Sequence, residues 1–198
     1  MEIQADKPAL LLIDLQKGWA NTEHWGGNRN NPEAELVAEE LLDFWRSKEL
    51  PVFHIIHSSK DPNSELHAAK PGHQMLDAFK PKQDEALIIK QVNSGFIGTS
   101  LKEQLESNNI DTLIIAGLTT NHCISTTTRM AGNFGFEVFL VADASATFDR
   151  KGVNGEVFPA ELVHQTALAS LNEEFATVTD STAIMKAILA NEALGLED

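Results

Sequence analysis

The chain has 198 residues, 42% of them hydrophobic, and carries 29 Asp and Glu against 15 Lys and Arg, a formal net charge of −14. This negative charge argues against nonspecific binding to nucleic acid or anionic lipid, because both are polyanions. A single cysteine excludes an intrachain disulfide framework and a zinc site built from several cysteines. Length and composition predict one globular domain over residues 1–198, with neither nucleic acid nor a membrane as partner.

The first predicted strand lies close to the N-terminus, in the stretch MEIQADKPALLLIDLQ. This stretch has no basic segment and no small-residue cleavage site of the kind that secretory signals carry. Its apolar run is far shorter than the ~20 residues that span a bilayer. We therefore expect a cytoplasmic protein whose cysteine stays reduced.

Six short apolar runs recur along the chain, and stretches with helical periodicity separate them. The runs are rich in aliphatic and β-branched residues, as expected of strands that are buried on both faces of a parallel sheet. Strands that alternate with helices predict a right-handed, doubly wound α/β sheet. The predicted strands are residues 9–14, 52–58, 86–90, 112–117, 137–143 and 175–179, and the predicted helices are residues 32–48, 100–107, 125–134, 160–171 and 182–190.

Two predicted loops are long, residues 21–31 and residues 60–84. Loops of such length in a compact domain tend to be lids, binding loops or oligomer contacts.

Three chemically active side chains follow predicted strands: Asp14 the first, Lys90 the third and Cys123 the fourth. Ligands of open α/β sheets bind at the carboxyl ends of the strands, so we expect these side chains to meet. Each alone has an ordinary explanation: Asp14 as a helix cap, Lys90 as a side chain that reaches solvent, Cys123 as a small buried hydrophobe. Together, an acid, a base and a nucleophile at neighbouring strand ends favour a catalytic site.

The chemistry expected of this trio is covalent catalysis. The Lys90 ammonium and the start of the following helix would both stabilise a Cys123 thiolate. Asp14 would take the thiol proton and pass it to a leaving group. Backbone N–H groups in the turn over residues 117–123 would hold an oxyanion.

Four stretches, in this order, carry a family resemblance: LLIDLQKGW, LIIKQVNSGFIGTSL, LIIAGLTTNHCISTTTRMAGNFGF and VFLVADASATFD. They resemble the isochorismatase-like cysteine hydrolases, which include nicotinamidases, carbamoyl-amide hydrolases and isochorismatases. The resemblance implies a Rossmann-like three-layer α/β/α sandwich around a six-stranded parallel sheet, with a catalytic triad of Asp14, Lys90 and Cys123. It also implies a cis peptide between Leu118 and Thr119. The N–H groups of Thr119 and Cys123 would then form the oxyanion hole.

The nicotinamidase branch of this family carries an Asp-x-His metal pair just after the second strand, where this chain has Ser59-Lys60-Asp61. Ser59 is a poor substitute for a carboxylate ligand, and Lys60 adds positive charge. His54 and His57 are three residues apart on a strand, so they face opposite sides and do not chelate one ion together. We therefore expect no metal, no other cofactor and no nicotinamidase activity.

The expected reaction is hydrolysis of a C–N bond in a small amide or carbamoyl compound, neutral or cationic, through a thioester at Cys123. The first alternative is the enol-ether hydrolysis of isochorismatases, a branch in which the cysteine is often not required. The second is a redox-thiol or binding protein of the same fold. The sequence holds no second cysteine to resolve a sulfenate, which disfavours the redox role.

Four further residues are predicted to bind substrate. Gln16 shares a face of the extended segment with Asp14, and His122 directly precedes the nucleophile. Trp19 and Phe96 are predicted to wall the pocket, although core or subunit-interface packing suits them equally well. Family members commonly close their sites with a neighbouring subunit, so we expect a homo-oligomer, either a dimer or a tetramer.

Overall fold

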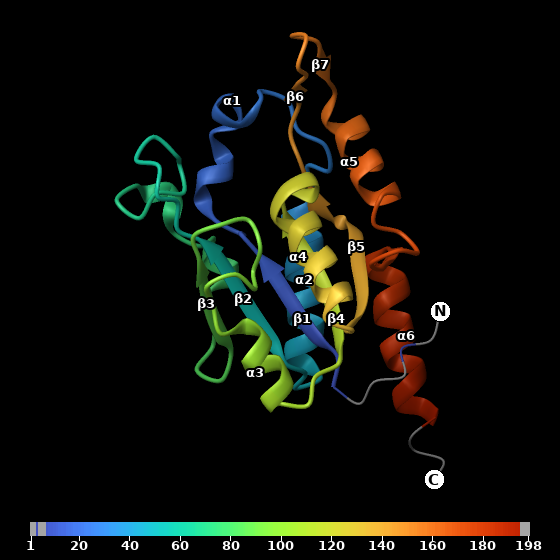
Figure 1. The fold of residues 1–198 in the computed structure, drawn as a ribbon. Coiled ribbons are helices and arrows are strands. Elements are labelled where there is room, and N and C mark those ends of the chain that lie inside the picture. Colours follow the sequence, from blue (N-terminus) through green and yellow to red (C-terminus); the bar gives the residue numbers. More distant parts are fainter. Residues whose placement is uncertain (1–2, 4–6, 195–198) are drawn as a thin grey trace.

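The fold is built on one six-stranded sheet (Figure 1). The computed structural model describes residues 3 and 7–194. The strand order is β3-β2-β1-β4-β5-β8, and every neighbouring pair is parallel, as predicted. The strands are β1 (Ala9–Ile13), β2 (Val52–His57), β3 (Ala86–Lys90), β4 (Thr112–Leu118), β5 (Glu137–Ala146) and β8 (Thr177–Thr179).

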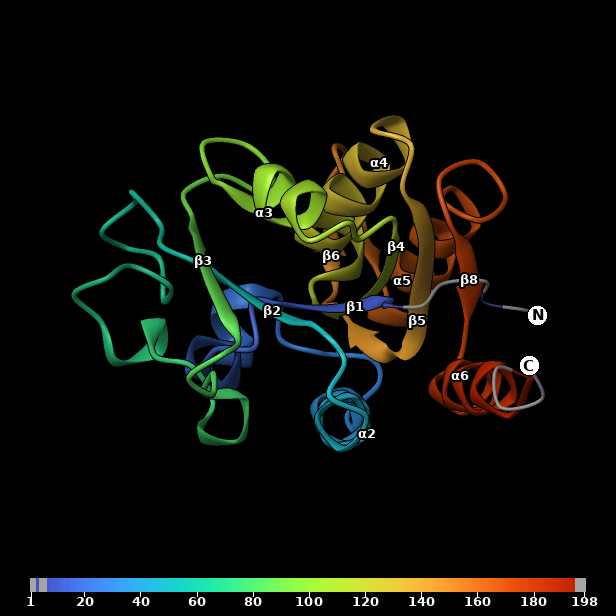
Figure 2. The ribbon, with the colours of Figure 1, turned by 90° about the horizontal axis from the view of Figure 1, so that it is seen from below.

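Helices cover both faces of the sheet, which makes a three-layer α/β/α sandwich (Figure 2). One face carries α2 (Ala34–Ser47) and α6 (Ser181–Leu194), and the other carries α3 (Leu101–Ser107) and α4 (Ser125–Asn133). The remaining long helix, α5 (Ala160–Ala169), contributes Leu168 to the same hydrophobic cluster as α3 and α4. These helices match the predicted ones apart from small shifts at their ends, and α6 continues past its predicted end at residue 190.

Strand β1 illustrates how the apolar runs form the core. Leu10 and Leu12 belong to the hydrophobic cluster that includes α2 and α6, whereas Leu11 and Ile13 belong to the cluster that includes α3 and α4. All four side chains are buried. Because successive side chains of a strand point to opposite faces, a continuous apolar run is what a strand covered on both faces requires.

The connections contain short elements that the sequence pattern did not predict. The β6–β7 hairpin pairs Arg150 with Phe158 and Lys151 with Val157, and lies at the same end of the molecule as α1 (Figure 1). Two residues per strand are too few to produce a recognisable alternation. The short elements are η1 (Lys17–Ala20), α1 (Thr22–Trp25), η2 (Pro71–His73), η3 (Asp77–Phe79), η4 (Thr120–Ile124), β6 (Arg150–Lys151) and β7 (Val157–Phe158).

No helix in the described part of the chain is long and apolar enough to cross a membrane.

Gly117 allows β4 to pass close to the end of β1. Its φ of 128° lies in a region that residues with a side chain rarely adopt. It pairs in register with Ile13, and a Cβ atom at this position would lie 2.0 Å from the Ile13 carbonyl oxygen. Since Asp14 follows Ile13 directly, this close approach also determines how far Asp14 lies from the turn after β4.

We expect Gly117→Ala to lower the free energy of unfolding by about 3 kcal/mol, because the clash with Ile13 adds to the backbone strain. For a domain of this size that loss corresponds to a thermal midpoint lowered by roughly 6–12 °C. The matched control is Gly135→Ala, whose φ of 91° is also unfavourable but whose Cβ would meet no atom within 4 Å. Equal losses in the two variants, measured by calorimetry, would contradict the close approach.

Candidate active site

Asp14 occupies a fully buried position directly after β1. Its φ of 55° is in the left-handed region, which is uncommon for a residue other than glycine. The Asp14 N–H donates to the Ile55 carbonyl at 2.7 Å, and the Asp14 carbonyl accepts from Trp19 Nε1 at 2.5 Å. These two hydrogen bonds hold the Asp14 carboxylate at the carboxyl end of the sheet.

Lys90 is the last residue of β3 and connects three segments of the site. Its ammonium, which is fully buried, donates to Asp14 Oδ2 at 2.8 Å, to His57 Nδ1 at 3.0 Å and to Cys123 Sγ at 3.3 Å. A lysine ammonium carries three N–H groups, so each of them has an acceptor. The structure thus brings together Asp14, Lys90 and Cys123, the three residues that the sequence places at strand ends.

Cys123 lies in η4, a single π-helical turn between β4 and α4. Such turns are rare and occur frequently at functional sites. The peptide bond between Leu118 and Thr119, just before this turn, is cis. The Thr119 N–H has no hydrogen-bond partner among the described residues. The Cys123 side chain is 6% exposed and faces a cavity, with Lys90 behind it.

Burial decides the protonation states of these groups. Burial lowers the pKa of Lys90, but Asp14 and Cys123 together outweigh that effect, so the lysine pKa is raised and the ammonium persists. Burial also raises the pKa of the Cys123 thiol well above its ordinary value, and the Asp14 carboxylate raises it further. Lys90 opposes these effects only in part.

The raised pKa favours a thiol in the free protein, whereas the sequence predicted that Lys90 stabilises a thiolate. The physical reason is that the Lys90 charge is already matched by Asp14, while desolvation penalises a second anion beside that carboxylate. The structure also offers an acceptor for the thiol proton. Asp14 Oδ1 is buried and has no hydrogen-bond partner among the described residues.

His57, to which the sequence analysis gave no role in the site, lines the cavity beside Cys123. Burial, and next the Lys90 ammonium, lowers the pKa of His57, so its ring is neutral at neutral pH. Because Nδ1 accepts from Lys90, the ring proton is on Nε2. The rule that ligands bind at the carboxyl ends of parallel strands would have predicted this residue, since His57 ends β2 and pairs in register with Lys90.

Gln16 anchors the backbone around the site and does not line the cavity. Its amide nitrogen donates to the carbonyls of His57 at 3.0 Å and His73 at 2.7 Å, and its oxygen accepts from the His57 N–H at 2.9 Å. These bonds connect the end of β2 to the loop over residues 60–84. The hydrogen-bonding capacity of the Gln16 side chain is thus directed to the backbone rather than to a ligand.

The cavity in front of Cys123 has a volume of about 270 Å³. Two of the predicted substrate-binding residues, Trp19 and His122, line it. Its aromatic wall consists of Trp19, Trp25 and Phe148, whose ring centroids lie 4.4 to 6.5 Å apart. The remaining wall includes polar side chains, so the cavity suits a small molecule with an apolar portion.

Phe96 lies outside this cavity. Its side chain is buried in the hydrophobic cluster under α3 and α4, and its ring packs against Phe134 at 5.3 Å and Phe136 at 6.2 Å between centroids. The predicted place of Phe96 in the pocket wall is therefore wrong, and its side chain packs in the core, one of the alternatives that the sequence left open.

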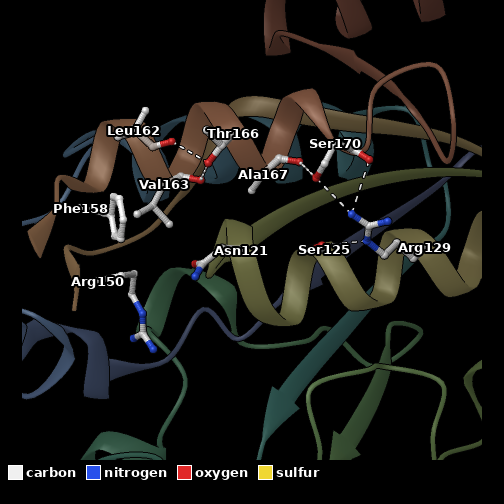
Figure 3. A pocket seen from close by; sticks show the side chains of 10 residues that line it. All are labelled: Asn121, Ser125, Arg129, Arg150, Phe158, Leu162, Val163, Thr166, Ala167 and Ser170. Carbon is white, nitrogen blue, oxygen red and sulfur yellow. Dashed lines mark hydrogen bonds between the residues drawn. The ribbon is translucent and has the colours of Figure 1, made fainter. Parts of the chain in front are cut away.

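A second and larger cavity, about 590 Å³, lies between α4, α5 and the β6–β7 hairpin (Figure 3). It contains no cysteine, and its wall combines Phe158, Leu162 and Val163 with hydroxyl groups and two arginines. Arg129 is held there by Ser125 Oγ at 3.3 Å and Ser170 Oγ at 3.1 Å. The other arginine, Arg150, also lines the cavity in front of Cys123.

The donor set for a metal ion is already occupied by Lys90. Within the described residues, Asp14, His57 and Cys123 are the one group of three metal-ligating side chains that converge, within 4.8 Å of one another. The Lys90 ammonium donates to all three, so a cation already fills their centre.

The segment that replaces the metal pair of nicotinamidases forms an ordinary turn. Ser59 Oγ accepts from the Asp61 N–H at 3.2 Å, and Asp61 Oδ1 accepts from the Asn63 N–H at 2.9 Å. These side chains stabilise the backbone of the loop rather than converge on a common point.

Comparison with known proteins supports the same family as the sequence motifs. The isochorismatase domain model matches residues 8–183. The chain is 43% identical over 173 residues to the uncharacterised isochorismatase family protein YrdC of Bacillus subtilis, an alignment that covers 87% of this chain and 91% of that protein. It is also 28% identical to Nicotinamidase 3 of Arabidopsis thaliana, with 92% and 89% of the two chains covered.

A solved structure of the same family has the same fold. A protein of the isochorismatase family from Chromobacterium violaceum superposes with a TM-score of 0.90 and 41% sequence identity. The superposition covers 94% of this chain and 96% of that one.

The raised pKa of Cys123 predicts slow alkylation by iodoacetamide at neutral pH, because only the thiolate reacts. We expect the folded protein to react more slowly than the guanidinium-unfolded chain at each pH. We also expect its rate to keep rising to about pH 10, beyond the ordinary cysteine pKa near 8.5. Mass spectrometry follows one site, since the chain has one cysteine. A reaction rate that is level between about pH 6 and 8 would indicate a resting thiolate instead.

Proposed function

The chain belongs to the isochorismatase family of hydrolases, and we propose that it hydrolyses the C–N bond of a small amide or carbamoyl compound through a thioester at Cys123. The observation that carries this proposal is the Lys90 ammonium, which contacts both the Asp14 carboxylate and the Cys123 sulfur beside a small cavity. This arrangement supplies a nucleophile, a base for its proton and a cation in one place.

In the first step, Asp14 Oδ1 takes the thiol proton as Cys123 Sγ attacks the substrate carbonyl carbon. The sulfur–carbon bond forms, the carbonyl π electrons move to oxygen, and the N–H groups of Thr119 and Cys123 stabilise that oxyanion. The free Thr119 N–H supports this role. Lys90 stabilises the sulfur during the transfer, when its negative charge is greatest.

In the second step, the C–N bond breaks and the leaving nitrogen takes the proton that Asp14 holds. The thioester remains on Cys123. Asp14, again a carboxylate, then removes a proton from a water molecule that attacks the thioester carbon, and the sulfur leaves and regains the proton. The products are an amine or ammonia and a carboxylic or carbamic acid.

The protonation state of Cys123 bears on the redox alternative. Sensor cysteines that form sulfenates are exposed thiolates with a low pKa. The Cys123 thiol is buried and its pKa is raised by that burial, which disfavours oxidation as its function. A free thiol stays reduced in the cytosol, and we propose that compartment for this protein.

We propose further that the protein is a homo-oligomer, in which apolar residues of the hairpin and of α5 form the contact. Val153, Val157, Phe158 and Leu162 are 99%, 64%, 40% and 48% exposed. Large apolar side chains gathered on one surface are typical of protein interfaces. The same surface borders the larger cavity and Arg150, so a second subunit there would lie close to the catalytic cavity.

The proposed reaction predicts ammonia release from at least one member of a panel of small primary amides and N-carbamoyl compounds. Cys123→Ala and Asp14→Asn are each expected to lower kcat/KM by about 10³-fold or more, because each removes a group that acts in bond making. A chelator is expected to leave the rate unchanged. Nicotinamide turnover that a chelator abolishes would contradict the metal-free assignment, and isochorismate turnover that survives Cys123→Ala would favour enol-ether hydrolysis.

Light scattering tests the assembly. The wild-type protein is expected to have at least twice the mass of one chain at micromolar concentration, and Phe158→Ser with Leu162→Ser is expected to reduce that mass. The control is Leu87→Ser with Ile89→Ser, which alters two exposed apolar residues of the edge strand β3, 44% and 54% exposed. Dissociation by the β3 pair alone would assign the contact to that edge.

A further inference from the structure

Arg150 stands at the boundary between the two cavities. It begins β6 and lines both the cavity in front of Cys123 and the larger cavity beside α5. Figure 3 shows its side chain directed away from Leu162 and Val163. The guanidinium of Arg150 is therefore in a position to meet a molecule that occupies the catalytic cavity.

Arg150 is an exposed residue, and its guanidinium has no ion pair or side-chain hydrogen bond with any described residue. The neighbouring Asp149 carboxylate forms no ion pair with Arg150; its Oδ1 accepts instead from the Ala160 N–H at 2.7 Å and from Asn28 Nδ2 at 3.2 Å. Arg129 is different, since two serines hold it and its guanidinium lies 4.6 Å from the Phe175 ring centroid. Arg150 thus has donors to spare for a ligand, and Arg129 has few.

The rest of the catalytic cavity is electrically neutral. Asp14 and Lys90 form a buried pair behind Cys123, and no Asp or Glu is among the residues that line the cavity. Burial lowers the pKa values of His57 and His122, so both rings are uncharged at neutral pH. Arg150 is consequently the one unbalanced charge among the described lining residues.

We infer that the substrate of this site is an anionic amide, whose carboxylate binds Arg150 while its C–N bond lies at Cys123. This inference rests on the proposed amide hydrolysis and replaces the expectation of a neutral or cationic substrate. A guanidinium presents parallel N–H groups that match the two oxygens of a carboxylate, and such charge-assisted pairs are about twice as strong as neutral ones. The apolar wall of Trp19, Trp25 and Phe148 suits the hydrocarbon between the two groups.

The net charge of −14 does not oppose this selection at short range. Exposed charges separated by more than about 8 Å are largely screened at physiological ionic strength. A carboxylate bound to Arg150 has the guanidinium as its nearest charge, and no Asp or Glu is among the residues that line the cavity. The acidic exterior affects the rate of encounter more than the affinity of the bound state.

The test uses three monoamides of dicarboxylic acids: malonamate, succinamate and glutaramate. Each is paired with the neutral methyl ketone in which a CH3 group replaces the charged oxygen of the carboxylate. Ammonia release is measured for both members of each pair. We expect the wild-type protein to favour at least one acid over its ketone by 10-fold or more in kcat/KM. Arg150→Gln is expected to remove that preference by lowering kcat/KM for the acid about 10- to 100-fold, as for a lost hydrogen bond to a charged group. The ketone rate should change less than twofold.

Two further variants distinguish the effect of the Arg150 charge from an unspecific effect of substituting an arginine near the cavity. Arg150→Lys keeps the charge and is expected to keep part of the preference. Arg129→Gln changes the other arginine of the larger cavity and is expected to leave the preference unaltered. Equal turnover of acids and ketones by the wild-type protein, or an unchanged preference in Arg150→Gln, would overturn the inference.

Binding to Cys123→Ala separates this inference from the proposed reaction. Titration calorimetry with succinamate and glutaramate measures binding without turnover. Acid binding that exceeds ketone binding and is lost in the Cys123→Ala, Arg150→Gln double variant would uphold the anion site even where the wild-type protein hydrolyses no amide. Absence of any preference for the acids in this titration would overturn the anion site, whatever amides the wild-type protein hydrolyses.

Discussion

The Lys90 ammonium joins segments that lie far apart in the chain: Asp14 after β1, His57 at the end of β2 and Cys123 in the turn after β4. Desolvation of a charged group costs several kcal/mol, and here three acceptors for three N–H groups offset that cost. Loss of one partner from a buried charge pair typically costs about 3–5 kcal/mol. The packing at the carboxyl end of the sheet therefore depends on this one cation and on the carboxylate beside it.

Lys90 contacts both Asp14 and Cys123, but of these two only the carboxylate forms an ion pair with it. The Asp14 carboxylate lies 2.8 Å from the ammonium, whereas burial and the neighbouring Asp14 carboxylate raise the pKa of the Cys123 thiol. A protonated Cys123 is less easily oxidised than a thiolate. It also makes activation depend on a substrate whose carbonyl can accept the sulfur's electrons, which is consistent with general-base catalysis.

Topology explains why the site lies where it does. Parallel strands place all their carboxyl ends at one edge, and the strand order puts β1 between β2 and β4, with β3 outside β2. Gly117 lets β4 approach Ile13 closely, and the π turn after β4 presents Cys123 to the cavity. The cavity that results is neutral apart from Arg150, which comes from a hairpin outside the main sheet.

The strands, most of the helices and the trio of Asp14, Lys90 and Cys123 could be predicted from the sequence. These follow from short-range periodicity and from the general rule that parallel strands end at one edge. The remaining features depend on contacts between segments that are distant in the chain. The direction of the His57 ring, the packing of Phe96 in the core and the protonation of Cys123 all depend on atoms that other segments bring into contact. Desolvation is a property of that three-dimensional environment, so no local pattern of residues reports it.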